Sequence, residues 1–125
     1  MILDIVNVNF GRTAVGLSMT DQAIANLAGQ ISISGNAVVW ASAQYHSTIR
    51  WPTTVTITQP VSITYFAISQ DDSIVVWEPG CRFVNAHLVS GQQYVVYAGG
   101  VLKTNGIPTP GNVTGLNAHG TGRVY

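Results

Sequence analysis

The stretch Ile31-Ser32-Ile33-Ser34-Gly35-Asn36-Ala37-Val38-Val39-Trp40 decides the fold expected for this chain. Its aliphatic residues alternate with serines, and a period of two is typical of a half-buried β-strand. Gly35-Asn36 suits a two-residue turn, because glycine readily takes the positive φ that such a turn needs. The stretch therefore predicts an antiparallel hairpin in which Ile33 faces Val38.

The same period continues through much of the chain. Residues 54–58 alternate threonines with Val55 and Ile57. A second hairpin is expected around Asp71-Asp72, since aspartate favours turns. The predicted strands are 31–34, 37–43, 54–58, 61–69, 73–78, 83–88 and 93–98. Many short strands with turn residues between them favour an all-β fold, and we expect an antiparallel β-sandwich.

One segment departs from this pattern and predicts a short helix near residues 21–28. Thr20 suits an N-cap, Asp21 suits the positive end of a helix, and Gly29 suits its C-terminal stop. The helix would have two turns at most, so it would depend on tertiary packing.

The last part of the chain is rich in glycine and proline and has no core-forming pattern. We therefore divide the chain into a single β-sandwich domain over residues 1–103 and an extended C-terminal arm over 104–125. The arm ends in Val124-Tyr125 and has Arg123 as its charged side chain. We expect it to become ordered on a neighbouring subunit, with Tyr125 as its anchor.

Composition narrows the range of functions. Charged residues make up only 8% of the chain and the formal net charge is zero, against about 25% charged residues in ordinary proteins. Such a surface is weakly protected against association. The five basic residues form no stripe, which argues against nucleic acid as a partner. No apolar run is long enough for a membrane helix, and the first residues lack the basic region of a signal peptide.

One short segment resembles a known family. Leu88-Val89-Ser90-Gly91-Gln92-Gln93-Tyr94-Val95-Val96-Tyr97-Ala98 is similar to the Leu-x-Pro-Gly-x-x-Tyr corner of fibronectin type III and related immunoglobulin-like sandwiches, with Ser90 in place of the proline. The resemblance implies that the Tyr94 hydroxyl bonds back to the corner backbone. It implies an immunoglobulin-like sandwich, and a jelly roll remains the alternative topology.

The chemically reactive residues form no recognisable catalytic or metal-binding set. Asp71-Asp72 is interpreted as a turn, and Cys81, which has no second cysteine to pair with, as a small core residue. His46, His87 and His119 lack metal-ligand spacing. We therefore predict that the chain is not an enzyme and holds no cofactor or metal.

Exposed aromatic residues offer the best candidate for a binding surface. Most strand tryptophans belong to a core, but Trp51 stands beside a proline at an expected strand end. Tyr45, His46 and Arg50 are close to it in sequence. We predict a ligand or partner contact formed by Tyr45, His46, Arg50 and Trp51, with Tyr125 as a separate contact.

Low charge, abundant Ser, Thr, Asn, Gln and Gly, short strands and a Gly/Pro-rich arm together resemble the structural proteins of tailed phages. This resemblance implies a virion subunit, such as a head decoration, collar or tail component, that is made in the host cytoplasm. It would bind copies of itself and other structural proteins. The alternative is a carbohydrate-binding module or lectin-like adhesin that uses Trp51 and Tyr45.

Overall fold

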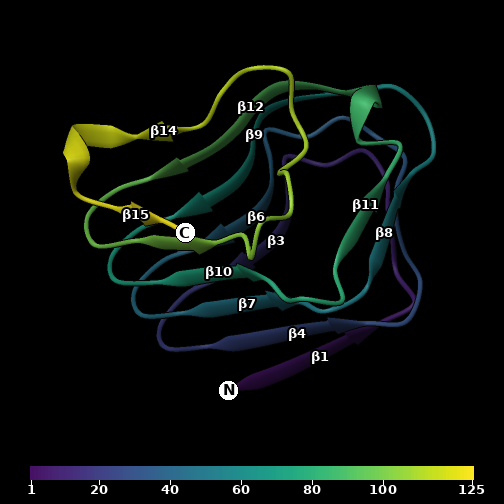
Figure 1. Cartoon of the computed structure of the whole chain (residues 1–125). Coiled ribbons are helices and arrows are strands. Elements are labelled where there is room, and N and C mark those ends of the chain that lie inside the picture. The colour runs from purple at the N-terminus through teal and green to yellow at the C-terminus, as the bar shows by residue number, and fades with distance from the viewer.

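The strands form three parallel sheets that wind around one core. The computed structural model describes residues 1–125. Sheet A has the strand order β1-β4-β7-β10-β13-β15, sheet B has β11-β8-β5-β2, and sheet C has β14-β12-β9-β6-β3. The chain visits A, B and C in turn and then starts again, so it forms a parallel β-solenoid of about five coils (Figure 1).

The strands have the following bounds, coil by coil. The first coil contains β1 (Ile2–Val6), β2 (Asn9–Phe10) and β3 (Val15–Met19), and the second contains β4 (Ile24–Ala28), β5 (Ile31–Ile33) and β6 (Val39–Ala43). The third contains β7 (Thr48–Trp51), β8 (Thr54–Ile57) and β9 (Val61–Ser69), and the fourth β10 (Ile74–Trp77), β11 (Arg82–Val84) and β12 (Val89–Val96). The fifth contains β13 (Val101–Lys103) and β14 (Leu116–Asn117), and β15 (Arg123–Val124) follows. Two short 3₁₀ helices, Ala86–Leu88 and Ala118–Gly120, complete the list.

The expected antiparallel sandwich is therefore wrong, in both its immunoglobulin-like and its jelly-roll form. Every strand pair is parallel, and each strand pairs with a strand one coil away. The stretch around Gly35-Asn36 contains β5 and β6, but these lie in sheets B and C and do not pair. Gly35 instead packs against the backbone of Arg12 in the first coil, and the Asn36 side chain accepts a hydrogen bond from Ser62 N. The two residues form a corner that contacts both neighbouring coils.

The predicted helix near 21–28 is also wrong. Residues Ile24–Ala28 form β4, which lies between β1 and β7 in sheet A. Ala25 and Leu27 are fully buried, and they alternate with the half-buried Ile24 and Asn26. A strand with neighbours on both sides makes all its backbone hydrogen bonds to them, which stabilises it despite its helix-compatible composition.

Turns with two consecutive left-handed residues separate sheet C from the next strand of sheet A. Asp21-Gln22, Tyr45-His46 and Asp71-Asp72 all have positive φ, between 53° and 64°. These turns stack: Gln22 N donates to Tyr45 O over 2.9 Å, and His46 N donates to Asp71 O over 2.9 Å. The prediction of a turn at Asp71-Asp72 agrees with the structure, whereas the hairpin around it does not.

The interior is filled by aromatic and aliphatic side chains from all three sheets. Trp51, Phe66, Trp77 and Phe83 form one aromatic cluster, with the Trp51 and Trp77 rings 5.6 Å apart and at 85° to each other. Such edge-to-face contacts add to the stabilisation that burial provides. The cluster lies in the third and fourth coils, close to the C-terminal segment.

Residues 104–125 lie against their own chain and are ordered there. The indole Nε1 of Trp77 donates to Thr109 Oγ1 over 2.8 Å, and Asn105 Nδ2 donates to Trp77 O over 2.8 Å. In addition, β14 pairs with β12 and β15 with β13. Between β13 and β14 the segment thus takes the place of a sheet B strand in the last coil, and it packs on its own chain.

The predicted tyrosine corner is not formed. Tyr94 lies in β12, which pairs with β9 and β14, and its ring packs against Gly115, where a Cβ atom would collide with it. The backbone at this point bonds elsewhere, since Gly91 N donates to Asn112 Oδ1 over 2.8 Å. Tyr94 therefore contributes to the fold through the packing of its ring and not through a hydroxyl bond to a corner.

Candidate functional site

The outer face of sheet A carries a row of aliphatic side chains. Strand pairing aligns Ile2, Ile24, Ile74 and Val101, with Thr48 at the centre, and we call this set the aliphatic row; Arg123 continues the same register on β15. Their neighbours in sequence, such as Ala25, Ile49 and Val75, are fully buried, so the row points outward. Ile2 is 68% exposed and Ile74 is 39% exposed. The row is therefore partly exposed in the single chain, since Ile24, Thr48 and Val101 are half-buried.

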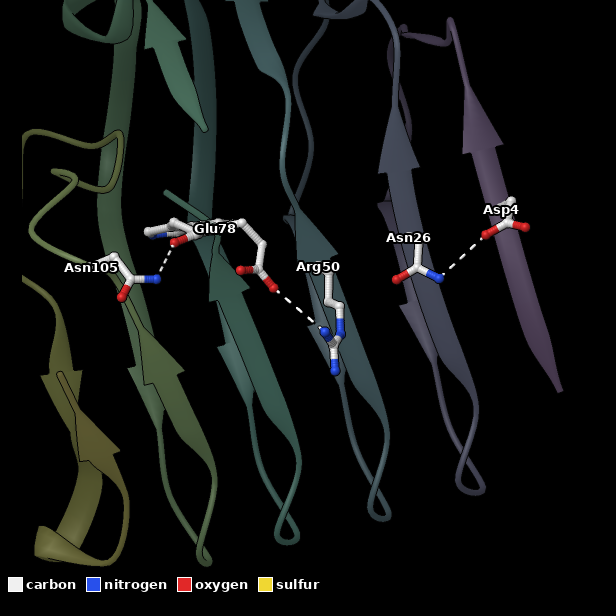
Figure 2. Close-up of polar contacts among 6 residues, drawn as sticks. Asp4, Asn26, Arg50, Glu78 and Asn105 are labelled. Atoms are coloured by element: carbon white, nitrogen blue, oxygen red, sulfur yellow. Dashed lines mark hydrogen bonds and ion pairs between the residues drawn. The ribbon is translucent and has the colours of Figure 1, made fainter. Parts of the chain in front are cut away.

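A polar row runs beside the aliphatic row. Asp4, Asn26 and Arg50 stand on successive strands and project to the same side (Figure 2). Asn26 Nδ2 donates to Asp4 Oδ1 over 3.3 Å, and Arg50 Nη1 lies 3.6 Å from Glu78 Oε1. Both contacts are open to solvent, so they add little stability. The polar row fixes charged groups at defined positions on a flat face.

The two ends of this face carry opposite charges. Asp4 stands on β1, at one edge of sheet A. Lys103 and Arg123 stand on β13 and β15, at the other edge. Tyr125 is 60% exposed beside Arg123, whose Nη1 donates to the Tyr125 hydroxyl over 3.3 Å. The face is thus acidic at one end and basic at the other, and between them the aliphatic row runs beside Asn26 and the Arg50–Glu78 ion pair.

A second candidate lies on the outer face of sheet C. It is a shallow hollow of about 350 Å³, which we call the tyrosine hollow. Its walls include Tyr65, Ile68, Val95, Tyr97, Leu116 and His119. They come from β9 and β12, from β14, and from the turns that follow β12 and β14. Three coils therefore contribute to one concave surface.

A network of polar side chains adjoins the tyrosine hollow at Tyr97. The Tyr97 hydroxyl donates to Gln70 Oε1, and Gln70 Nε2 donates to Gln44 Oε1 over 3.0 Å and to Asp71 Oδ2 over 3.0 Å. Burial raises the pKa of Tyr97 above its usual value, and the nearby Asp71, Tyr65 and Tyr45 raise it further. The Tyr97 hydroxyl therefore stays protonated at neutral pH.

A third concavity, a polar groove of about 730 Å³, follows sheet B and its border with sheet A. Its lining includes Asn7, Asn9, Gln30, Ser32, Thr54 and Thr56. Several of these groups bond to one another: Asn9 Oδ1 accepts from Ser32 Oγ over 3.0 Å, and Asn7 Oδ1 accepts from Gln30 N over 2.7 Å. The groove is hydrophilic, contains no aromatic ring, and uses much of its hydrogen-bonding capacity internally.

The structure separates the residues predicted to form one contact patch. Tyr45 and His46 occupy a turn, and Tyr45 is 53% exposed and lies near Tyr97. Arg50 lies on the outer face of sheet A, and so does Tyr125. Trp51 points the opposite way from Arg50 and is completely buried, so it cannot serve as a surface platform. Tyr65 and Tyr97, which sequence reasoning missed, are the aromatic residues that line the hollow.

Reactive side chains are dispersed in the fold. No three His, Cys, Asp or Glu side chains converge in a way that could hold a metal ion. Burial raises the pKa of Cys81 to about 12, so its thiol is protonated and a poor nucleophile at neutral pH. Asp71 and Asp72 stand in their turn with left-handed backbones. The fold also contains no helix that is long and apolar enough to span a membrane.

No family model, curated protein or solved structure is detectably similar to this chain. The surfaces described above are therefore the basis for assigning a function.

Proposed function

We propose that this chain is a non-enzymatic assembly subunit whose copies associate through the outer face of sheet A. The aliphatic row is the observation that carries the proposal. An exposed sheet face is ordinarily polar at alternate positions, whereas Ile2, Ile24, Ile74 and Val101 are apolar here. Covering the row with the same row of a second copy removes apolar surface from water in both subunits.

The charges on the face favour one orientation. If the two sheets pack with their strands in the same direction and their solenoid axes reversed, β1 of each copy lies over β15 of the other. Asp4 then faces the Arg123–Tyr125 end of the second copy, and this contact occurs twice because the interface is isologous. The opposite arrangement would place Asp4 over Asp4 and is disfavoured by like-charge repulsion.

The centre of the interface is compatible with this orientation. There β7 lies over β10 of the second copy, so the Arg50–Glu78 ion pair of each subunit meets the other pair in reversed order. Four charges of alternating sign result, and each remains near a partner of opposite sign. Charges that stay paired on burial avoid most of the cost of an isolated buried charge.

The interface is small, so the association should be weak. Six strands of two to five residues, with about 3.3 Å per residue and about 4.8 Å between strands, cover roughly 360 Å² of sheet per subunit. A stable interface usually buries about 800 Å² per partner. We therefore expect a dimer that dissociates on dilution, or a larger assembly in which several such contacts act together.

Sedimentation velocity over a wide concentration range tests the proposal. The unmodified chain should shift from monomer towards dimer as its concentration rises. Ile74→Lys should abolish the shift, because it places a charge in the middle of the apolar row. Val38→Lys is the matched control, since Val38 is 52% exposed and does not belong to sheet A. Circular dichroism should show that both variants are folded.

A charge reversal tests the orientation. Asp4→Lys and Arg123→Asp should each weaken the dimer, and the double variant should restore it because the reversed charges again face each other. A chain that stays monomeric at every concentration, or an association unchanged by Ile74→Lys, would overturn the proposal. Failure of the double variant to recover would overturn the orientation.

A role for such an assembly in a phage particle is a proposal that rests on composition alone. Mass spectrometry of purified particles from the source would test it, and absence of the chain from every particle fraction would contradict it.

A further inference from the structure

We propose that the tyrosine hollow on sheet C binds a neutral oligosaccharide, with one or two sugar rings held between Tyr65 and Tyr97. The hollow lies on a different sheet from the assembly face, so this inference is independent of the proposed association. Its volume of about 350 Å³ is at the lower end of the range for small-molecule sites, about 300–1,000 Å³. One or two sugar rings fit such a shallow space better than a long chain does.

The walls suit the apolar face of a sugar. Tyr65 and Tyr97 supply ring surfaces, and Ile68, Val95 and Leu116 supply the aliphatic floor and edge. The face of an aromatic ring is electronegative, so it attracts the weakly positive C–H groups of a pyranose. Val95 is almost completely buried, whereas Leu116 is largely exposed, so the floor is covered and the mouth is open.

The polar network beside Tyr97 suits the hydroxyl groups of a sugar. Gln44 Oε1 and Asp71 Oδ2 already accept hydrogen bonds from Gln70. This fixes both side chains and leaves Gln44 Nε2 free to donate and Asp71 Oδ1 free to accept. The Tyr97 hydroxyl donates to Gln70 and can still accept. Donors and acceptors that are held in place before binding lose little entropy when a ligand arrives.

The charges around the hollow select against acidic ligands. No Lys or Arg lines it, His119 is its one basic side chain, and the Asp71 carboxylate lies near the Tyr97 hydroxyl. An acidic sugar or a phosphate would approach this carboxylate without a lysine or arginine to offset the repulsion. The polar groove of sheet B is also neutral, but it has no aromatic ring on which a sugar could stack. The sheet C hollow combines ring surfaces with a neighbouring network of amide and carboxylate groups at Tyr97.

The conformation of Tyr45 is consistent with this site. Its φ is 53°, a left-handed value that is unfavourable for a bulky residue. The neighbouring turns place Asp21 and Asp71 at comparable positions, and aspartate tolerates this conformation better. A strained and exposed tyrosine near Tyr97 extends the aromatic surface of the hollow at a cost in stability.

Saturation-transfer NMR and calorimetry with the whole chain test the inference. The probes are maltose, cellobiose, lactose and diacetylchitobiose, with sialyllactose as the acidic member of the panel. At least one neutral sugar should bind, and sialyllactose should bind more weakly than lactose. Tyr65→Ala and Tyr97→Ala should each weaken binding at least about tenfold, which corresponds to about 1.4 kcal/mol.

Two controls separate binding from folding and from assembly. Tyr125→Ala removes an exposed tyrosine on sheet A and should leave sugar binding unchanged. Tyr97→Phe keeps the ring and should retain more affinity than Tyr97→Ala. The inference is overturned if no neutral sugar binds the folded chain, if sialyllactose binds as tightly as lactose, or if both alanine variants bind normally. Sedimentation of the same samples reports on association separately, so either proposal can fail alone.

Discussion

The indole nitrogen of Trp77 donates a hydrogen bond of 2.8 Å to the hydroxyl of Thr109, thirty-two residues further along the chain. Both groups are buried, and the bond joins the fourth coil to the Gly/Pro-rich C-terminal segment. Trp51 packs against Trp77, yet its own indole nitrogen is buried without a partner. Two adjacent tryptophans in one cluster therefore differ in hydrogen bonding.

This difference predicts unequal costs for two matched substitutions. Trp77→Phe loses ring volume and also leaves the Thr109 hydroxyl without its buried donor. Trp51→Phe loses the same volume but removes an unpaired N–H. Trp77→Phe should therefore be the more destabilising variant, by about 1–2 kcal/mol. Chemical denaturation of both variants measures the difference, and a larger loss in Trp51→Phe would contradict the assigned hydrogen bonds.

Truncation after Lys103 should destabilise the whole solenoid. It removes β14 and β15, together with Ile107 and Thr109, which pack against the end of the core. In the intact chain Val96 and Leu102 are fully buried, and the truncation would expose part of their side chains to solvent. Thermal unfolding followed by circular dichroism should show a much lower midpoint or no cooperative transition. An unchanged midpoint would mean that the segment contributes nothing to the fold.

A pair of glycine substitutions tests the stacking of coils. Gly100 lies against the carbonyl of Ser69, so a Cβ atom there would collide with backbone that cannot rotate away. Gly100→Ala should therefore destabilise strongly, by about 2 kcal/mol or more. Gly11 has open space around the same position. Gly11→Ala should be neutral or slightly stabilising, by up to about 1 kcal/mol. Equal melting temperatures for the two variants would contradict the close approach at Gly100.

The positions of most strands could be predicted from the sequence, but their partners could not. Alternation at residues 54–58 and 61–69 correctly indicates β8 and β9. Alternation shows that a strand has two different faces. It does not indicate whether the strand pairs with its neighbour across a tight turn or with a strand one coil away. Ile31, for example, pairs with Val55. Spacings of 21 to 28 residues between paired positions vary from coil to coil, so the repeat is hard to see in the sequence.

The candidate site was predictable only in part, for the same reason. The alternation in Thr48-Ile49-Arg50-Trp51 places Trp51 on the same face as Ile49, which is a core face, and this signal could have excluded it as a platform. Gln70 and Tyr97 are neighbours because one coil lies on the next. No local pattern connects them, so the tyrosine hollow becomes visible only when the coils are stacked.

Because the thiol of Cys81 is buried, we expect the folded chain to lose stability at alkaline pH. Its pKa is raised from 9.0 to about 12 in the folded chain, because burial disfavours the thiolate. Below about pH 9 the thiol is protonated in both states, and its contribution is constant. Between pH 9 and pH 12 only the unfolded chain releases the proton, so the stability falls by up to about 1.4 kcal/mol per pH unit. Denaturation of the unmodified chain and of Cys81→Ala should diverge over this window, and parallel curves would contradict the burial of the thiol.

Substitution of Tyr45 should change the stability of the chain and its affinity for a sugar in opposite directions. Asparagine tolerates the left-handed backbone at this position better than tyrosine does. The ring is largely exposed, so its removal costs little burial. Tyr45→Asn should therefore raise the free energy of unfolding by a few tenths to about 1 kcal/mol. If the ring extends the tyrosine hollow, the same variant should bind a neutral disaccharide several times more weakly. His46→Asn is the matched control, because it relieves a similar backbone strain in the same turn and leaves the aromatic surface intact. A stabilised Tyr45→Asn variant with unchanged affinity would show that the hollow ends at Tyr97, whereas a destabilised variant would show that the tyrosine side chain supports the turn itself.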